Sequence, residues 1–240
     1  MALGPGHAAT LADGCIIRND WICPAYVRTR KDEILAALGE HVYITLTSLV
    51  FGTLIAFGLA LVARRWRRVQ GVVLGSSTML YTIPSLAMFS LLLPVMNGLG
   101  LDTLSATTVI VGLVLYSLTI LVRGILAGLD GIAADVREAA VGMGYSTRRL
   151  LWRVELPLAL PTIFATLRVA AVSTVALTTV GVLIEHGGLG NLIDQGQDSN
   201  FKAEVLTGSV LCVVLAIVAD LLLVGVERLM IPWRRAAAAR

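Results

Sequence analysis

The 240-residue sequence lacks the short motifs that mark many well-known catalytic sites. It has no Gly-x-x-x-x-Gly-Lys-Ser/Thr loop, which cradles nucleotide phosphates, so we expect that the chain neither binds nor hydrolyses ATP. A nucleophile elbow and the helical zinc-protease motif are also missing. His7, His41 and His186 do not have a metal-ligand spacing with the cysteines. We therefore predict no catalytic site, no metal site and no enzyme.

Cysteine is scarce, with 3 residues in the whole chain. Cys15 and Cys23 lie close together in the mostly polar N-terminal segment 1–40, and they could form a disulfide if this segment is outside the cytoplasm. Two free thiols remain the alternative, because spacing alone does not prove pairing. Segment 1–40 has no basic leader followed directly by an apolar core, so we expect no cleaved signal peptide.

Apolar residues are abundant instead. They make up 57% of the chain, with a mean hydropathy of +0.83, whereas soluble domains contain about 45–50%. We predict an all-α polytopic membrane protein with a transmembrane domain over 41–235 and a short tail, 236–240. Five apolar runs have the roughly 20 residues that a spanning helix needs. They are Val42–Val62, Gly71–Met96, Leu104–Leu126, Ile163–Ile184 and Val205–Val226.

Arginine clusters at the ends of these runs predict the orientation in the membrane. The clusters at 64–68, within 135–161 and near the C-terminus fall on one side of a five-span chain, which the positive-inside rule assigns to the cytoplasm. The N-terminus is then outside, and Lys31–Glu40 would form a short amphipathic helix there. The net charge of +3 therefore reflects membrane topology, and we expect lipid and no nucleic acid as a partner.

The most strongly patterned polar stretch is 135–161, DVREAAVGMGYSTRRLLWRVELPLALP, which lies between two apolar runs. We predict a short helix from Val136 to Met143 with Asp135 as its N-cap, because negative charge is favourable at the positive end of a helix. Gly144 can take the left-handed conformation that ends a helix at little cost.

A second short helix is predicted from Arg148 to Glu155, capped by Ser146 or Thr147. Pro157 and Pro161 would then end or redirect the chain, since proline supplies no backbone N–H. The two helices would form a helix-turn-helix elbow at the membrane surface. An ordinary amphipathic loop lying on lipid headgroups is the alternative.

A proline interrupts the second predicted span. Pro84 should kink or break the helix and leave carbonyl groups that need partners in protein or in a water-filled cavity. Tyr81, Thr82 and Ser85 supply polar groups beside it. This position is therefore either a plain packing kink or a pore-lining site.

Asp220 places a carboxylate inside the fifth predicted span, where an unpaired charge is costly. Arg168 and Arg123 should lie at a comparable depth, so we expect a structural ion pair between Asp220 and one of these two arginines. A proton relay is the alternative.

The spacing within 135–161 resembles the cytoplasmic EAA loop of ABC-importer permeases. Glu138-Ala139-Ala140 is followed after three residues by Gly144, then after nine by an aliphatic residue, one further residue and Leu156-Pro157. Val154 stands where isoleucine is usual. The chain from about 38 to 235 resembles a type I permease subunit of the binding-protein-dependent class. Three stretches resemble permeases for osmoprotectants such as glycine betaine, choline and carnitine: Ile34–Thr47, Thr82–Pro94 and Gly187–Gly196.

This resemblance implies a bacterial or archaeal inner-membrane subunit that works by alternating access. It implies a second permease subunit, a cytoplasmic ATPase dimer that holds ATP and Mg, and a separate extracytoplasmic binding protein. The elbow would couple mechanically to the ATPase through Glu138, Ala139, Ala140, Gly142, Gly144, Leu156 and Pro157. The weaker candidates for the translocation path are Tyr81, Thr82, Pro84, Ser85 and Tyr116. Methionine-type permeases share a Gly-Gly-Leu-Gly segment and remain an alternative, as does a membrane scaffold or intramembrane enzyme.

Overall fold

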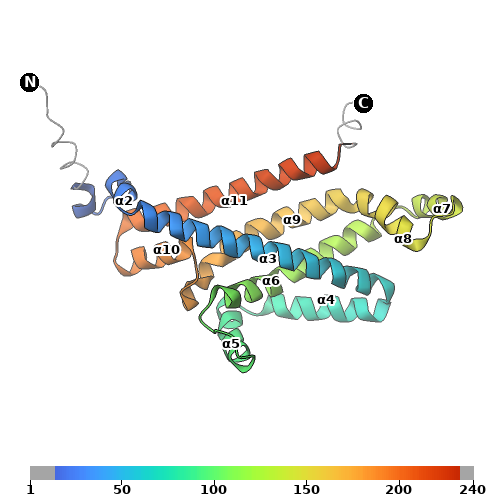
Figure 1. Cartoon of the computed structure of the whole chain (residues 1–240), viewed down its shortest axis with the longest axis horizontal. Helices are drawn as coiled ribbons and strands as arrows, with labels where there is room; N and C mark the ends of the chain where they lie inside the picture. Colours follow the sequence, from blue (N-terminus) through green and yellow to red (C-terminus); the bar gives the residue numbers. More distant parts are fainter. Residues whose placement is uncertain (1–13, 233–240) are drawn as a thin grey trace, which may run out of the picture. The chain divides into compact units, whose positions relative to one another are not determined.

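A computed structural model describes residues 14–232, and all regular structure within this range is helical (Figure 1). Among the described residues, four helices are long and apolar enough to cross a membrane: α3 (Lys31–Arg65), α6 (Ala106–Asp130), the continuous helix Thr147–Ile184 and α11 (Lys202–Met230). A fifth span is present if α4 (Arg67–Thr82) and α5 (Ser85–Gly98), a bent pair, are counted together. The predicted tail 236–240 and His7 lie outside the described residues.

The N-terminal part of the first span differs from the expectation. Instead of a separate short helix over Lys31–Glu40, a single helix α3 runs without a break from Lys31 to Arg65. No proline interrupts it, and its terminal charges suit the helix dipole, with Asp32 and Glu33 in the first turn and Arg64 and Arg65 in the last. The helix therefore continues across the boundary at 40/41 that the hydropathy pattern predicts.

The second predicted span is broken at Pro84, between α4 and α5. Ile83 at the end of α4 is extended, with φ −69° and ψ 125°. The ring of a following proline disfavours the helical conformation for the residue before it, which explains the end of α4. Pro84 thus breaks this helix, as the sequence predicts.

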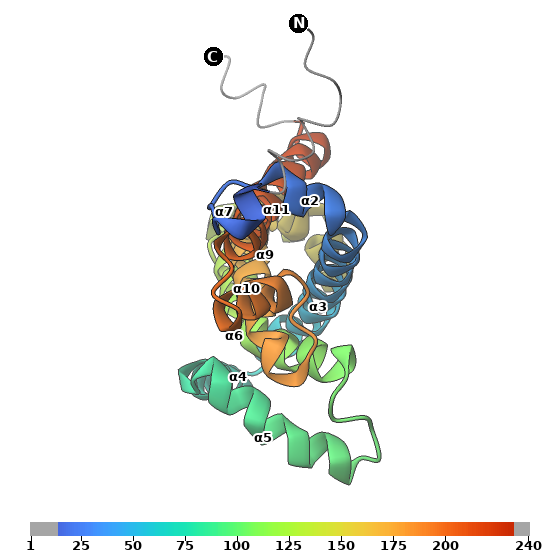
Figure 2. The ribbon, with the colours of Figure 1, turned by 90° about the vertical axis from the view of Figure 1, so that its left-hand side faces the viewer.

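Two compact units can be distinguished within the chain. The first contains the segments up to Thr47, Ser85–Gly112 and Val175–Ala216. In this unit, α2 (Pro24–Thr29) and the beginning of α3 pack with α10 (Leu189–Asp198) and the beginning of α11 (Figure 2). Its buried cluster consists of Cys15, Cys23, Ala25, Tyr26, Ile34, Leu189, Leu192 and Ala203.

A close backbone approach inside the first unit explains its Gly-Gly-Leu-Gly segment. Gly188 has φ +55°, and a Cβ placed there would lie 2.7 Å from the Cβ of His41 and 2.8 Å from its backbone nitrogen. Any side chain would therefore clash with α3. The loop before α10 can pack against this helix only with glycine at 188.

The second unit contains Ser48–Pro84, Leu113–Thr174 and the chain from Ile217 onward. Here one face of α3 presents Ala56, Ala60 and Ala63, all fully buried, to the larger apolar side chains of α6. Small residues at helix interfaces allow close approach of two backbones, which is the common solution in membranes, where the lipid is as apolar as the core. The partners from α6 in this cluster are Leu118, Leu121, Val122, Ile125, Leu126 and Leu129.

Candidate functional site

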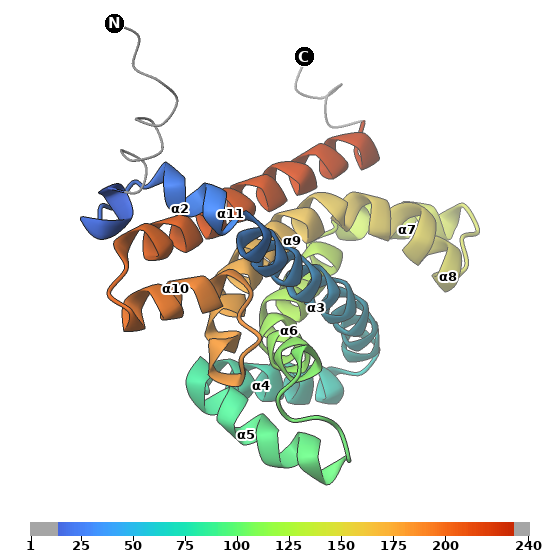
Figure 3. The ribbon, with the colours of Figure 1, turned by 60° about the vertical axis from the view of Figure 1, so that its left-hand side comes forward.

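The polar stretch 135–161 begins with two short helices joined by a tight turn. Helix α7 (Ala134–Gly142) is followed by Gly144 at φ +82° and by α8 (Thr147–Leu150), which leads into the long helix that contains α9 (Leu156–Thr178) (Figure 3). The left-handed Gly144 is as expected. We call residues 134–155 the elbow.

The outer surface of α7 combines the carboxylates of Asp135 and Glu138 with small and apolar groups. Glu138 and Ala139 are exposed, whereas Ala140 is buried. Val141 is 59% exposed, and Met143, directly after the helix, is 71% exposed. Gly142 and Gly144 are exposed too and leave the backbone accessible. This surface can admit another protein closely.

The first residues of the two helices in the elbow differ from the predicted first residues by one or two positions. Ala133, and not Asp135, is the N-cap of α7, and Asp135 lies in the first turn, where its carboxylate accepts a 2.9 Å hydrogen bond from the Val136 N–H. The acid still satisfies a free backbone donor near the positive end of the helix. Ser146 is the N-cap of α8, without a side-chain capping bond.

The prediction that Pro157 and Pro161 end or redirect the chain is wrong. The helix continues through both prolines by way of a π-helical turn, η1 (Leu151–Glu155). Here the Leu156 N–H donates to the Leu151 carbonyl, five residues back. In a π turn the backbone N–H donates to the carbonyl five residues back, and here this turn lies just before Pro157, which has no N–H to donate. Such turns are frequent at functional sites. Leu156 and Pro157 are half-buried at this junction.

Glu155, which was not singled out from the sequence, is the centre of an ion-pair network at the base of the elbow. Its side chain is only 5% exposed. Arg64 at the end of α3 donates from both terminal nitrogens to the two carboxylate oxygens, at 2.7 and 2.6 Å. Arg137 of α7 donates from Nε to Oε1 at 2.9 Å.

The same two arginines extend the network to the end of α6. Arg137 also donates to the Leu129 carbonyl at 2.5 Å, and Nε of Arg64 lies 3.3 Å from Oδ1 of Asp130. One buried carboxylate thereby joins α3, α6, α7 and η1. Breaking such a buried pair on one side leaves an uncompensated charge, which is strongly destabilising. The feature of the sequence that could have indicated Glu155 is its position as a lone acid directly before Leu-Pro in an arginine-rich stretch, but the sequence does not show which arginines pair with it.

Asp220 of α11 pairs with Arg168 of α9 in a two-point contact. Nε and Nη2 of Arg168 donate to the two carboxylate oxygens at 2.7 and 2.8 Å. Arg123, the other candidate partner, instead donates to the Thr78 hydroxyl at 2.5 Å. Paired charge and a fork-shaped guanidinium suit the structural role expected for an acid within a span.

The residues around Pro84 come together only in part. The Tyr116 hydroxyl donates to the Ile83 carbonyl, one of the acceptors that the break exposes. Its ring packs edge-on against Tyr81, with centroids 5.9 Å apart. The Thr82 hydroxyl bonds to the Met79 carbonyl within its own helix. Ser85 is half-buried at the start of α5, in the other unit.

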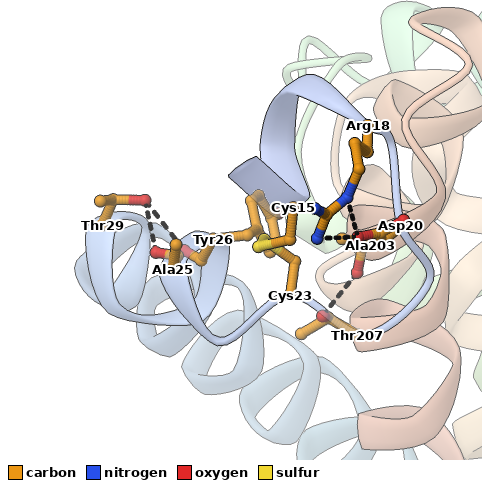
Figure 4. The surroundings of a disulfide bond; sticks show 9 residues. All are labelled: Cys15, Arg18, Asp20, Cys23, Ala25, Tyr26, Thr29, Ala203 and Thr207. Carbon is orange, nitrogen blue, oxygen red and sulfur yellow. Dashed lines mark hydrogen bonds and ion pairs between the residues drawn. A yellow bond between two sulfur atoms is a disulfide. The ribbon is translucent and has the colours of Figure 1, made fainter. Parts of the chain in front are cut away.

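Between the two alternatives for Cys15 and Cys23, the structure contains the disulfide (Figure 4). The loop that it closes is held against the start of α11, because the Asn19 amide donates to the Asn200 carbonyl at 2.6 Å and the Lys202 N–H donates to the Asn19 side-chain oxygen at 2.8 Å. Next to the disulfide, burial and the nearby Glu204 carboxylate raise the pKa of the Tyr26 hydroxyl.

His41 and His186 make polar contacts within the first unit. His41 is fully buried, its Nε2 lies 3.1 Å from the Val175 carbonyl, and its Nδ1 accepts from the Leu189 N–H at 3.2 Å. His186 Nδ1 lies 2.6 Å from a carboxylate oxygen of Glu40. Within residues 14–232, no group of three or more His, Cys, Asp or Glu side chains is arranged to hold a metal ion.

Several apolar spans, small-residue helix packing and the elbow define the class as a polytopic membrane protein. The family model described as "Binding-protein-dependent transport system inner membrane component" matches residues 48–235, and the chain belongs to that family. It is thus a transport permease and not an enzyme.

Curated relatives match over most of the chain. The glycine betaine/carnitine/choline transport system permease protein OpuCD of Bacillus subtilis (strain 168) is 34% identical, covering 84% of this chain and 86% of that protein. The choline transport system permease protein OpuBD of the same organism is 34% identical, covering 88% and 91%. Among solved structures, a chain of the MetNI methionine ABC transporter in an inward-facing conformation has a TM-score of 0.73 at 21% identity, covering 82% of this chain and 95% of that chain. The last likeness shows the fold alone.

Proposed function

We propose that this chain is the membrane-spanning permease subunit of an ATP-driven importer for an osmoprotectant such as glycine betaine, choline or carnitine. The identity of about one third to OpuCD and OpuBD, over more than four fifths of the chain, carries the proposal for the substrate class. The surface of the elbow supports the proposal for the mechanism.

In this mechanism the elbow receives force from a cytoplasmic ATPase subunit that binds ATP and Mg. The exposed surface around Glu138, Ala139 and Gly142 would dock into the ATPase, because its small side chains permit close approach. Glu155 would transmit the movement, since it ties the elbow to the ends of α3 and α6. Leu156 and Pro157 would carry it into α9. Glu138, Ala139, Ala140 and Gly144 would act mechanically, without touching the nucleotide.

The arrangement at the membrane is part of the same proposal. The elbow contacts Arg64 in the arginine cluster at the end of α3, which supports a cytoplasmic position for both under the positive-inside rule. The N-terminus would lie outside, where the Cys15–Cys23 disulfide would persist, and the C-terminus inside. A second permease subunit, identical or a sister chain, would complete the path.

Substrate recognition is assigned mainly to a separate extracytoplasmic binding protein. A quaternary ammonium group is held best by aromatic faces, and aromatic residues make up only 6% of this chain. Tyr81 and Tyr116, which pack together near the break at Pro84, are the proposed contacts along the path. A methionine-type or other small-solute permease is the second candidate, because methionine-type permeases share the Gly-Gly-Leu-Gly segment found here at 187–190.

The proposal is tested by reconstituting the chain with its co-purifying ATPase and a binding protein in liposomes. Uptake of radiolabelled glycine betaine, choline, carnitine and methionine is compared at equal concentrations. We expect ATP-dependent uptake of at least one quaternary amine and none of methionine. Uptake of methionine alone would refute the osmoprotectant assignment, and the absence of a co-purifying ATPase would refute the importer.

A further inference from the structure

A cavity of about 680 Å³ lies beside the Glu155 network, between the end of α3 and the elbow. We call it the arginine pocket. Its walls come from α3, α7, α8 and η1, all within the second unit. The lining residues are Leu61, Arg64, Arg65, Arg137, Thr147, Arg148, Leu150, Leu151 and Glu155.

The charge of the arginine pocket is strongly unbalanced. Four arginines line it, against the single carboxylate of Glu155. Arg64 and Arg137 are engaged by that carboxylate. Arg65 and Arg148 are exposed and make no ion pair with any residue of 14–232. The pocket therefore presents two free guanidinium groups to an incoming anion.

The rest of the lining is apolar. Leu61 and Leu151 are partly buried and pack on the core of the second unit, and Leu150 is half-buried beside them. A free inorganic anion would gain no binding energy from these apolar side chains. A molecule that carries a phosphate at one end and a hydrocarbon chain at the other would match both parts of the pocket.

We propose that the arginine pocket binds an anionic phospholipid, whose phosphate lies between Arg65 and Arg148 and whose acyl chain contacts Leu61 and Leu151. Basic pockets between membrane helices on the cytoplasmic side are suited to acidic lipid headgroups. The cytoplasmic position rests on the orientation in the proposed function, but the binding chemistry does not. Because the pocket is shared by α3 and the elbow, a bound lipid would brace one against the other.

Native mass spectrometry of the full-length chain in detergent tests the site. The probes are palmitoyl-oleoyl phosphatidylglycerol, the matching phosphatidylcholine and inorganic phosphate. We expect tighter binding of phosphatidylglycerol than of phosphatidylcholine. Each arginine near a membrane surface contributes about fivefold to the binding of an acidic lipid, so the double variant Arg65→Gln/Arg148→Gln should lose about thirtyfold.

The matched control is Arg68→Gln/Arg149→Gln, which removes the same charge from exposed neighbours that do not line the pocket. It should lose less than about threefold in affinity. Because all four arginines are exposed and lie outside the ion pairs of Glu155, both double variants should fold. If the pocket double variant does not fold, the single variant Arg65→Gln or Arg148→Gln is measured in its place.

Three results would overturn the proposal. They are equal losses in the two double variants, undiminished binding to Arg65→Gln/Arg148→Gln, and displacement of phosphatidylglycerol by inorganic phosphate at equal concentration. Uptake by the same variants in the liposome assay separates the two proposals. Uptake by a chain that shows no preference for phosphatidylglycerol leaves the importer standing, whereas selective lipid binding without uptake leaves only the pocket.

Discussion

Neutralising Glu155 while keeping its shape tests how the elbow is held in place. In Glu155→Gln an amide of the same size replaces the carboxylate, but Arg64 and Arg137 lose the negative charge that they contact at 2.6–2.9 Å. The side chain is 5% exposed, so water cannot replace the lost partner. Removing one side of a buried ion pair costs about 3–5 kcal/mol.

The two arginines are 24% and 29% exposed, so solvent screens part of the charge left behind. We therefore expect the lower end of the range, about 3 kcal/mol. In a chain of this size each kcal/mol shifts the unfolding midpoint by about 2–4 °C, so thermal unfolding in detergent should move down by about 6–12 °C. Asp198→Asn is the matched control, an exposed acid that loses the same charge, and its midpoint should stay close to that of the wild type.

A double-mutant cycle with Arg137→Gln completes the test. If Glu155 and Arg137 act as a pair, the double variant should be less destabilised than the sum of the single variants, since no uncompensated charge remains on that side. Additive losses, or a Glu155→Gln variant as stable as Asp198→Asn, would refute the account of the network.

The remaining predictions concern the turn, the intramembrane pair and the disulfide. Gly144→Val, which forces a β-branched residue to φ +82°, should leave assembly with the ATPase intact but abolish uptake per ATP hydrolysed, and unchanged uptake would count against the elbow's role. Asp220→Asn should lower the yield of folded chain because it leaves Arg168 uncompensated, and Asp220→Asn/Arg168→Gln should restore it; folding without transport in Asp220→Asn would favour a proton relay instead. Cys15→Ser should destabilise the N-terminal loop by about 2.5 kcal/mol, the entropic cost of closing a loop with this sequence separation of 8 without the cross-link, and the wild type without reductant should be lighter by two hydrogen atoms in intact-mass analysis than with it.

The elbow shows how far local sequence carries the prediction. Local sequence was sufficient to predict a helix around Glu138, a left-handed Gly144 and a second helix after Ser146, because these features depend on residues within a few positions of each other. The end of the second helix was predicted wrongly at Pro157. Proline rules describe an α-helical register, and the π turn at 151–155 changes that register.

Long-range pairs could not be predicted in the same way. Asp220 had two candidate arginines at a comparable depth in the sequence, and the structure shows that it pairs with Arg168. Glu155 gave no indication of its partners, since Arg64 lies 91 residues away. Tyr116 meets the carbonyl at the Pro84 break for the same reason, through the packing of α6 against the end of α4.

Composition and local spacing thus determined the class of this protein, its apolar spans and the elbow, because hydropathy and short-range periodicity are properties of neighbouring residues. The tertiary structure alone decided which charges meet, where the helix passes through its prolines and that an arginine-lined cavity adjoins the elbow. These features depend on the azimuth and depth of helices that are distant in the sequence, and no local pattern encodes them.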